Sequence, residues 1–266
     1  MKGVSLFHQT QLELLPETQA WLSNLQTRPS NYYLSKLNTL IYNLKVAGIY
    51  PQLDRMWIFA TENRDNAQVS IVNPSAKLTE APNGGTLTWT RLQGYTSDGT
   101  HSFLNTNFSA STQGVNFTMN NAAIGIYSRT NSAVANISEL GGEDAAGNGV
   151  SLDAKNGSGF IGVRLNASAN TFSNSITTSL GLISMARTVS ATTNAYQNGS
   201  LVTAIAAPST AIVSPAIYVL AGNISGVVGG WSTRQISMVY MGSGSINQQA
   251  FYSIFQTFAI QTGFNV

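Results

Sequence analysis

The chain has 266 residues, of which 43% are hydrophobic and only 9% are charged. Soluble domains usually carry about 25% charged residues, so Thr, Ser, Asn and Gln must cover most of the surface, a composition that favours strands over helices. The 13 basic and 11 acidic residues form no basic run that would neutralise several phosphates, so we expect no nucleic-acid partner. Without cysteine the chain has no disulfides or thiolate zinc sites, and we expect no metal and no cofactor.

Residues 1–52 are predicted to form a helical arm. Two amphipathic stretches begin at Pro16 and after Pro29, and Gly48 and Pro51 end the second. Their apolar positions fall on one helical face: Trp21, Leu22, Leu25, Tyr33, Leu37, Leu40, Ile41 and Leu44. Two short helices cannot hide this surface against each other, so the arm must pack on the rest of the chain or on another subunit. We expect it to be the attachment or oligomerisation element.

Residues 53–266 are predicted to form one all-β domain, an antiparallel jelly-roll β-sandwich. Short runs of Ile, Val, Phe, Tyr and Thr alternate with Gly, Asn, Asp and Ser at the spacing typical of sandwiches. The pair Asn198-Gly199 predicts a tight type I′ hairpin between two of these runs. We expect strands near 55–61, 86–91, 101–107, 122–129, 133–139, 149–153, 159–165, 180–188, 192–197, 200–205, 216–222 and 234–241.

A C-terminal helix is predicted after Ser245, which with Gln248 forms a capping box. Phe251, Ile254, Phe255 and Phe258 then follow at helical spacing, and Gly263 ends the helix. Such a stripe must be buried, most simply on the sandwich or on the arm.

Neither a membrane span nor a secretory signal is predicted. The uncharged stretch 201–224 is interrupted by Pro208, Pro215 and Asn223, which indicates two short strands and no membrane insertion. Polar residues follow Lys2 too soon for a signal peptide, so we expect assembly in a cytoplasm without export.

Three segments together resemble the concanavalin A-like lectin and glucanase (laminin-G-like) group, in particular its copies in bacteriophage virion and tail proteins. Residues 94–99, which lead into 102–106, are similar to the early strand of that group. Residues 183–187 followed by 196–199 are similar to its central hairpin, and 234–242 are similar to its closing strand. The resemblance covers about 53–266. It implies a jelly-roll fold, and it supports the fold more than any function.

No catalytic residue is predicted. Glucanases of this fold hold two carboxylates on one strand at spacings of two or four residues, and the chain has no such motif. Its only acidic cluster is Glu139, Glu143 and Asp144, which we interpret as a solvated loop. The two histidines, His8 and His101, are interpreted as structural. Oxygen ligands for calcium would come from Asp144, Asn148 and Asp153, and loop residues of these types usually cap turns.

Sugar binding on a sandwich needs an exposed aromatic beside amides and an arginine. The candidate ligand-binding residues by type are Trp89, Tyr127, Arg129, Asn131 and Trp231. The alternative interpretation is that these aromatics are core residues and the amides form turns.

The sequence therefore predicts a non-catalytic structural component of a phage virion, in its tail or fibre or on its capsid. Its partners would be other virion proteins or further copies of itself, with a host-surface glycan as a candidate ligand. The alternatives are a soluble lectin-like carbohydrate-binding module and a divergent glycoside hydrolase.

Overall fold

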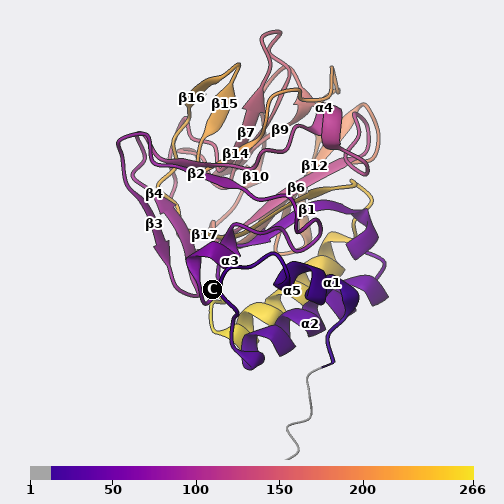
Figure 1. Ribbon diagram of the computed structural model, residues 1–266. Helices are drawn as coiled ribbons and strands as arrows, with labels where there is room; N and C mark the ends of the chain where they lie inside the picture. The colour runs from indigo at the N-terminus through magenta and orange to yellow at the C-terminus, as the bar shows by residue number, and fades with distance from the viewer. Residues whose placement is uncertain (1–12) are drawn as a thin grey trace, which may run out of the picture.

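The structure, a computed structural model, describes residues 13–266. Two β-sheets pack face to face, and helices form a further layer against the outer face of one sheet (Figure 1). Among the described residues every strand pair is antiparallel except β15 with β7. The predicted antiparallel β-sandwich with an N-terminal helical extension and a C-terminal helix is confirmed.

The eight-stranded sheet has the order β13-β12-β11-β6-β17-β4-β3, and β1 also pairs with β17. Its strands run in chain order as β1 (Leu53–Ile58), β3 (Leu87–Thr90), β4 (Gly94–Ser97), β6 (Ala122–Ser128), β11 (Gly181–Arg187), β12 (Thr192–Gln197), β13 (Ser200–Ala206) and β17 (Ile236–Gly242).

The nine-stranded sheet has the order β10-β9-β8-β7-β14-β5-β2, with β15 beside β7 and β16 beside β15. Its strands are β2 (Thr79–Ala81), β5 (Phe103–Asn105), β7 (Leu140–Glu143), β8 (Gly149–Asp153), β9 (Phe160–Ala167), β10 (Thr171–Ser175), β14 (Tyr218–Val219), β15 (Gly222–Ile224) and β16 (Val227–Gly229).

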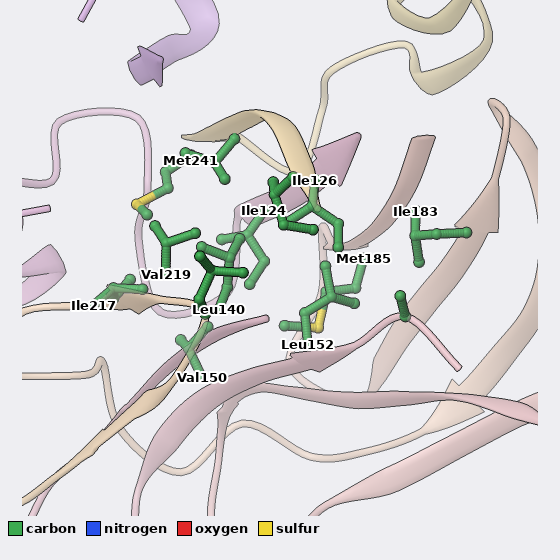
Figure 2. Close-up of a cluster of buried hydrophobic side chains, with 14 of the residues drawn as sticks. Ile124, Ile126, Leu140, Val150, Leu152, Ile183, Met185, Ile217, Val219 and Met241 are labelled. Atoms are coloured by element: carbon green, nitrogen blue, oxygen red, sulfur yellow. The ribbon is translucent and has the colours of Figure 1, made fainter. Parts of the chain in front are cut away.

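Strict alternation of side chains along the strands builds the core between the two sheets. On β6 and β11 the inward residues are Ile124, Ile126, Ile183 and Met185, and they meet inward residues of the nine-stranded sheet such as Leu152 (Figure 2). All of these side chains are buried. Each fully buried aliphatic side chain stabilises the fold by about 1.5–3 kcal/mol, so this cluster accounts for the pairing of the sheets.

The helices are α1 (Pro16–Leu22), α2 (Asn31–Val46), a 3₁₀ turn (Tyr50–Gln52), α3 (Arg64–Ala67), α4 (Ala110–Gln113) and α5 (Gln248–Thr262). The Ser30 side chain caps α2 by accepting from the Tyr33 N–H. The predicted capping box at Ser245 is wrong, because α5 is capped by Asn247, whose side chain accepts from the Ala250 N–H.

A second core lies between the eight-stranded sheet and the helices. The sheet contributes the alternate residues of its strands, among them Met238 and Tyr240, and α5 contributes Phe251, Phe255 and Phe258. The same cluster contains the apolar residues of α1 and α2, among them the buried Trp21 and Leu37. The described part of the arm therefore packs on the sandwich and on the Phe stripe of α5. Its role in attachment stays a prediction.

The predicted hairpin at Asn198-Gly199 is confirmed, since both residues have positive φ, 50° and 79°. The strand expected at 133–139 is wrong. Those residues form a loop that precedes β7. The strands β2, β4, β7, β10, β15 and β16 were not expected, because each has at most five residues and shows little alternating pattern.

Two features bear on the membrane and histidine predictions. Within residues 13–266 no helix combines the length and the apolar character that a membrane crossing needs. His8 lies outside the described residues, and His101 is an exposed residue whose Nδ1 contacts the Thr100 hydroxyl.

Candidate functional site

The outer face of the nine-stranded sheet is the one large sheet face that neither core uses. The other three faces are the two that meet in the sandwich core and the one beneath the helices. On the outer face, side chains of β7, β8 and β9 point away from the core, and two adjoining cavities open there. We call the two cavities together the sheet groove.

The first cavity has a volume of about 230 Å³ and a floor without bulky side chains. Across neighbouring strands the register aligns Gly222, Gly141, Ser151 and Arg164. A Cβ atom added at Gly141 would lie 2.8 Å from the Gly222 Cα, so the two glycines let β7 and β15 approach closely. Glycine at these two positions therefore permits the close packing of β7, β15 and Ser138 at the floor of the cavity.

Arg164 and Glu143 close one end of the first cavity. The Arg164 guanidinium donates to the Glu143 carboxylate at 2.6 Å and to the Ala167 carbonyl at 3.0 Å, and it also donates to the Gly147 carbonyl. The Arg164 side chain is buried. The two charges neutralise each other, so this end of the groove carries little net charge.

The second cavity has a volume of about 180 Å³ and contains a row of three residues. Asp153 on β8 pairs with Gly162 on β9, and Gly162 pairs with Phe172 on β10. Neighbouring strands lie about 4.8 Å apart, so the carboxyl and the phenyl ring stand on strands roughly 10 Å apart with a glycine between them. Phe172 is 53% exposed. The row leaves a slot with an acidic side and an aromatic side.

Four residues line both cavities and join them into one groove: Asn136, Ile137, Ser151 and Asn170. Asn136 sits at positive φ, 59°, in the loop before β7. Both of the shared asparagines are exposed. Amides placed in this way offer both a donor and an acceptor to a ligand that lies along the groove.

Asp153, which lines the second cavity, belongs to a buried ionic cluster. The Arg234 guanidinium donates to Glu139 at 2.5 Å, to the carbonyls of Ser132 and Lys155 at 2.7 Å each, and weakly to Asp153 at 3.5 Å. The side chains of Arg234 and Glu139 are fully buried. Burial, together with the nearby Glu139 charge, raises the pKa of Asp153 to about 7, although Arg234 opposes the rise.

This cluster also shows that the expected solvated acidic loop is wrong. Glu139 is a buried ion-pair partner, and Glu143 belongs to β7. Asp144 lies in the turn to β8, where its carboxylate accepts from the Asn148 N–H at 2.8 Å. The residues considered as calcium ligands do not converge, because Asp144 precedes β8 and Asp153 is the last residue of that strand. Within the described residues no three acidic or histidine side chains gather as a metal site.

The five residues predicted to bind a ligand do not gather at one site. Trp231 comes nearest to the groove: it follows Gly230, which lines the first cavity, and its ring lies 6.0 Å from that of Phe103. Phe103 stacks at 4.4 Å on Tyr218, whose strand borders β7. Trp231 is half-buried and lines neither cavity.

The other four residues lie elsewhere. Tyr127 is fully buried beneath α5, and its hydroxyl donates to Gln256 at 2.7 Å. Arg129 donates to the Phe264 carbonyl, and the Asn131 side chain accepts from the Ser179 N–H at 3.1 Å. The half-buried Trp89 donates to the Phe59 carbonyl at 3.0 Å. These contacts tie elements of the fold together, and ligand binding by these residues stays a prediction.

Neither a protein-family model nor a curated protein matches the sequence. Solved structures do match the fold. One is domain 4 of an extracellular arabinanase from Geobacillus stearothermophilus, solved in complex with arabinotriose. The TM-score is 0.54 at 11% identity, and the match covers 76% of this chain and 98% of that domain.

Botulinum neurotoxin structures also match. The serotype D binding domain has a TM-score of 0.52 at 12% identity over 79% of this chain. A type C structure, whose description ties cell entry to two ganglioside molecules, has a TM-score of 0.50 at 14% identity over 79%. The chain spans about half the length of these toxin chains, 52% and 53%. At such identities the likeness shows a shared β-sandwich fold.

Proposed function

We propose that this protein binds glycans in the sheet groove and does not hydrolyse them. The observation that carries the proposal is the groove itself: a glycine floor, unobstructed amides and an exposed aromatic ring on the one large sheet face that neither core uses. Sugars present hydroxyl groups around apolar ring faces, so they are bound by such a mixture of convergent polar groups and apolar surface.

The size of the groove suits an oligosaccharide. The two cavities of about 230 and 180 Å³ share four lining residues and together form one extended groove. That a matching arabinanase domain was solved with arabinotriose, and that a matching toxin interacts with gangliosides, supports a glycan as the ligand class.

The spacing of the groove carboxylates supports binding without hydrolysis. Glu143 pairs with Gly149, and Asp153 lies four residues further along β8. At about 3.3 Å per residue the two carboxylate-bearing positions are roughly 13 Å apart. Glycoside hydrolases hold their two carboxyls about 5–9.5 Å apart. Glu139, which lies nearer to Asp153, is fully buried.

Ser151 offers a direct test, because it lines both cavities. Ser151→Trp should fill the groove and abolish the glycan-array signal of the wild-type protein. Ser200→Trp is the matched control, since Ser200 is an exposed strand serine on the eight-stranded sheet. Equal binding by the Ser151→Trp variant and the wild type, with unchanged thermal melts, would rule the groove out as the site.

We also propose that the helical layer attaches the protein to a larger assembly. The exposed apolar side chains Tyr32, Tyr42 and Val46 fall on one side of α2, which lies across the sandwich from the groove (Figure 1). A protein attached through this face would present the groove outward. The sequence resemblance to phage virion proteins is what supports a virion as that assembly.

Light scattering tests the attachment proposal. Tyr42→Glu combined with Val46→Glu should prevent self-association of the full chain without lowering its melting temperature much, because both residues are more than half exposed. The proposal would be contradicted by a wild-type protein that stays monomeric at high concentration and that makes no contact with another subunit through this face in its native assembly.

A further inference from the structure

The ionic cluster beside the second cavity has an unbalanced negative charge. Two carboxylates, Glu139 and Asp153, share the single guanidinium of Arg234. Arg234 lies 2.5 Å from Glu139 and 3.5 Å from Asp153, so it is committed mainly to Glu139. A buried carboxylate without a close cation is costly, and it is relieved either by a proton or by a cation from outside.

No neighbouring basic side chain supplies that cation. None of the residues that line the second cavity is Lys, Arg or His, and Asp153 is the only ionisable one among them. Lys155 follows β8, but its ammonium donates to the Thr177 carbonyl at 2.8 Å. On the remaining element packed against Asp153, β9, the partner residue is Gly162. The position next to Asp153 is therefore open to a ligand.

The Asp153 side chain keeps one oxygen for that ligand. Its Oδ1 accepts from the Lys155 N–H at 3.1 Å and from Arg234, whereas its Oδ2 accepts no hydrogen bond from the described residues. The side chain is 90% buried and lines the cavity. Across Gly162 stands the exposed ring of Phe172, and a cation also binds favourably to an aromatic face.

We infer that the second cavity takes a protonated amino group, so that the protein prefers glycans that contain an amino sugar with a free amine. The inference rests on the proposed glycan-binding function. In the bound state the ammonium donates to Oδ2 of Asp153 and completes the charge balance of two carboxylates with two cations. A neutral N-acetyl group at the same place could donate one hydrogen bond but would leave the Asp153 carboxylate without a counter-charge.

The test compares matched pairs of oligosaccharides that have the same backbone and carry either free amines or N-acetyl groups. We expect the wild-type protein to bind the free-amine form about tenfold or more tightly, the range of a hydrogen bond to a charged group. Asp153→Asn should lose this preference and still bind the N-acetyl form. Asp144→Asn is the matched control, since Asp144 lies outside both cavities, and it should behave as the wild type.

The pH dependence gives a second readout. Asp153 gains a proton as the pH falls from about 7 to about 5, where the ligand amine stays protonated, so the preference for the amine should shrink. If Asp153→Asn does not fold, an NMR titration of the wild type decides, because the pKa of Asp153 must fall when the amine ligand binds.

The possible results separate the two proposals. Equal binding of both oligosaccharide forms, or a preference that survives Asp153→Asn, overturns the amine inference and leaves glycan binding intact. Binding of neither form overturns glycan binding and the inference with it.

Discussion

Replacing Arg234 by Met should be the most damaging single substitution near the groove. The guanidinium is fully buried and donates to Glu139 and to the carbonyls of Ser132 and Lys155. Methionine keeps much of the side-chain volume and removes every one of these bonds. Glu139 keeps the hydrogen bonds from the Ser232 hydroxyl and the Ala154 N–H but becomes a buried charge without a counter-ion, and breaking a buried ion pair from one side costs about 3–5 kcal/mol. That is about a fifth or more of the stability of a typical domain.

Urea unfolding of the full chain measures this cost. At about pH 8 the free energy of unfolding of Arg234→Met should lie about 3–5 kcal/mol below the wild-type value. The difference should shrink at about pH 5, because Asp153 is then protonated in both proteins. Adding Glu139→Gln to Arg234→Met should restore part of the loss, since it removes the unpaired charge. A loss below about 1 kcal/mol would refute this reasoning. A double variant whose loss in free energy of unfolding exceeds the sum of the two single-variant losses would refute it too.

Three further predictions follow from the same contacts. Phe172→Ala should weaken glycan binding by about 1 kcal/mol, about fivefold, in titration calorimetry. Tyr42→Ala removes a similarly exposed aromatic ring on α2 and should not weaken binding, so equal effects would contradict the groove as the binding site. Gly199→Val should destabilise the fold by well over 1 kcal/mol in thermal melts, because its Cβ would lie 2.7 Å from a backbone atom of α5. The control Gly226→Val meets open space and bears only the strain of positive φ, so similar losses in the two variants would argue against the close approach to α5. The folded-state pKa of Asp153, about 7, lies above that of an unfolded Asp, so the contribution of Asp153 to stability is lost as the pH rises from about 4 through 7. The free energy of unfolding of the wild type should therefore fall over this pH range, and that fall should be absent in Asp153→Asn; an equal fall in both proteins would contradict the assignment.

The sandwich was predictable because its core strands carry a strong periodic signal. On β6 and β11 the isoleucines and Met185 face the sandwich core, and the residues between them, such as Tyr127 and Leu182, face the helices. Both strands were expected at nearly their observed bounds. The hairpin at Asn198-Gly199 was predictable for a local reason, since this pair readily adopts positive φ. The Phe stripe likewise predicted a buried α5.

The groove could not be predicted in the same way. Two of its strands, β8 and β9, were expected near 149–153 and 159–165, whereas β7, which contains Gly141 and Gly142, and the polar strand β10 were not expected. The residue type that opens the groove is the one that weakens the strand signal. Glu139 looked like a loop carboxylate because its partner, Arg234, lies 95 residues away.

The aromatic candidates failed to gather because residue type does not reveal exposure. Tyr127 alternates with core residues on β6 and faces α5, so its size serves packing. Phe172, on the edge strand β10, is the exposed ring beside the groove. The signal that would have indicated it is a lone aromatic in a polar stretch of Thr, Ser and Asn, a pattern that is typical of an exposed strand face.

Hydrogen exchange on the full chain, with and without a glycan found by array, tests the central claim most directly. The account predicts that the ligand slows amide exchange along the groove, in 136–143, 149–153 and 170–172, and leaves α2 and α5 unchanged. Protection confined to the helical layer or to the loops of the eight-stranded sheet, with none along the groove, would contradict it.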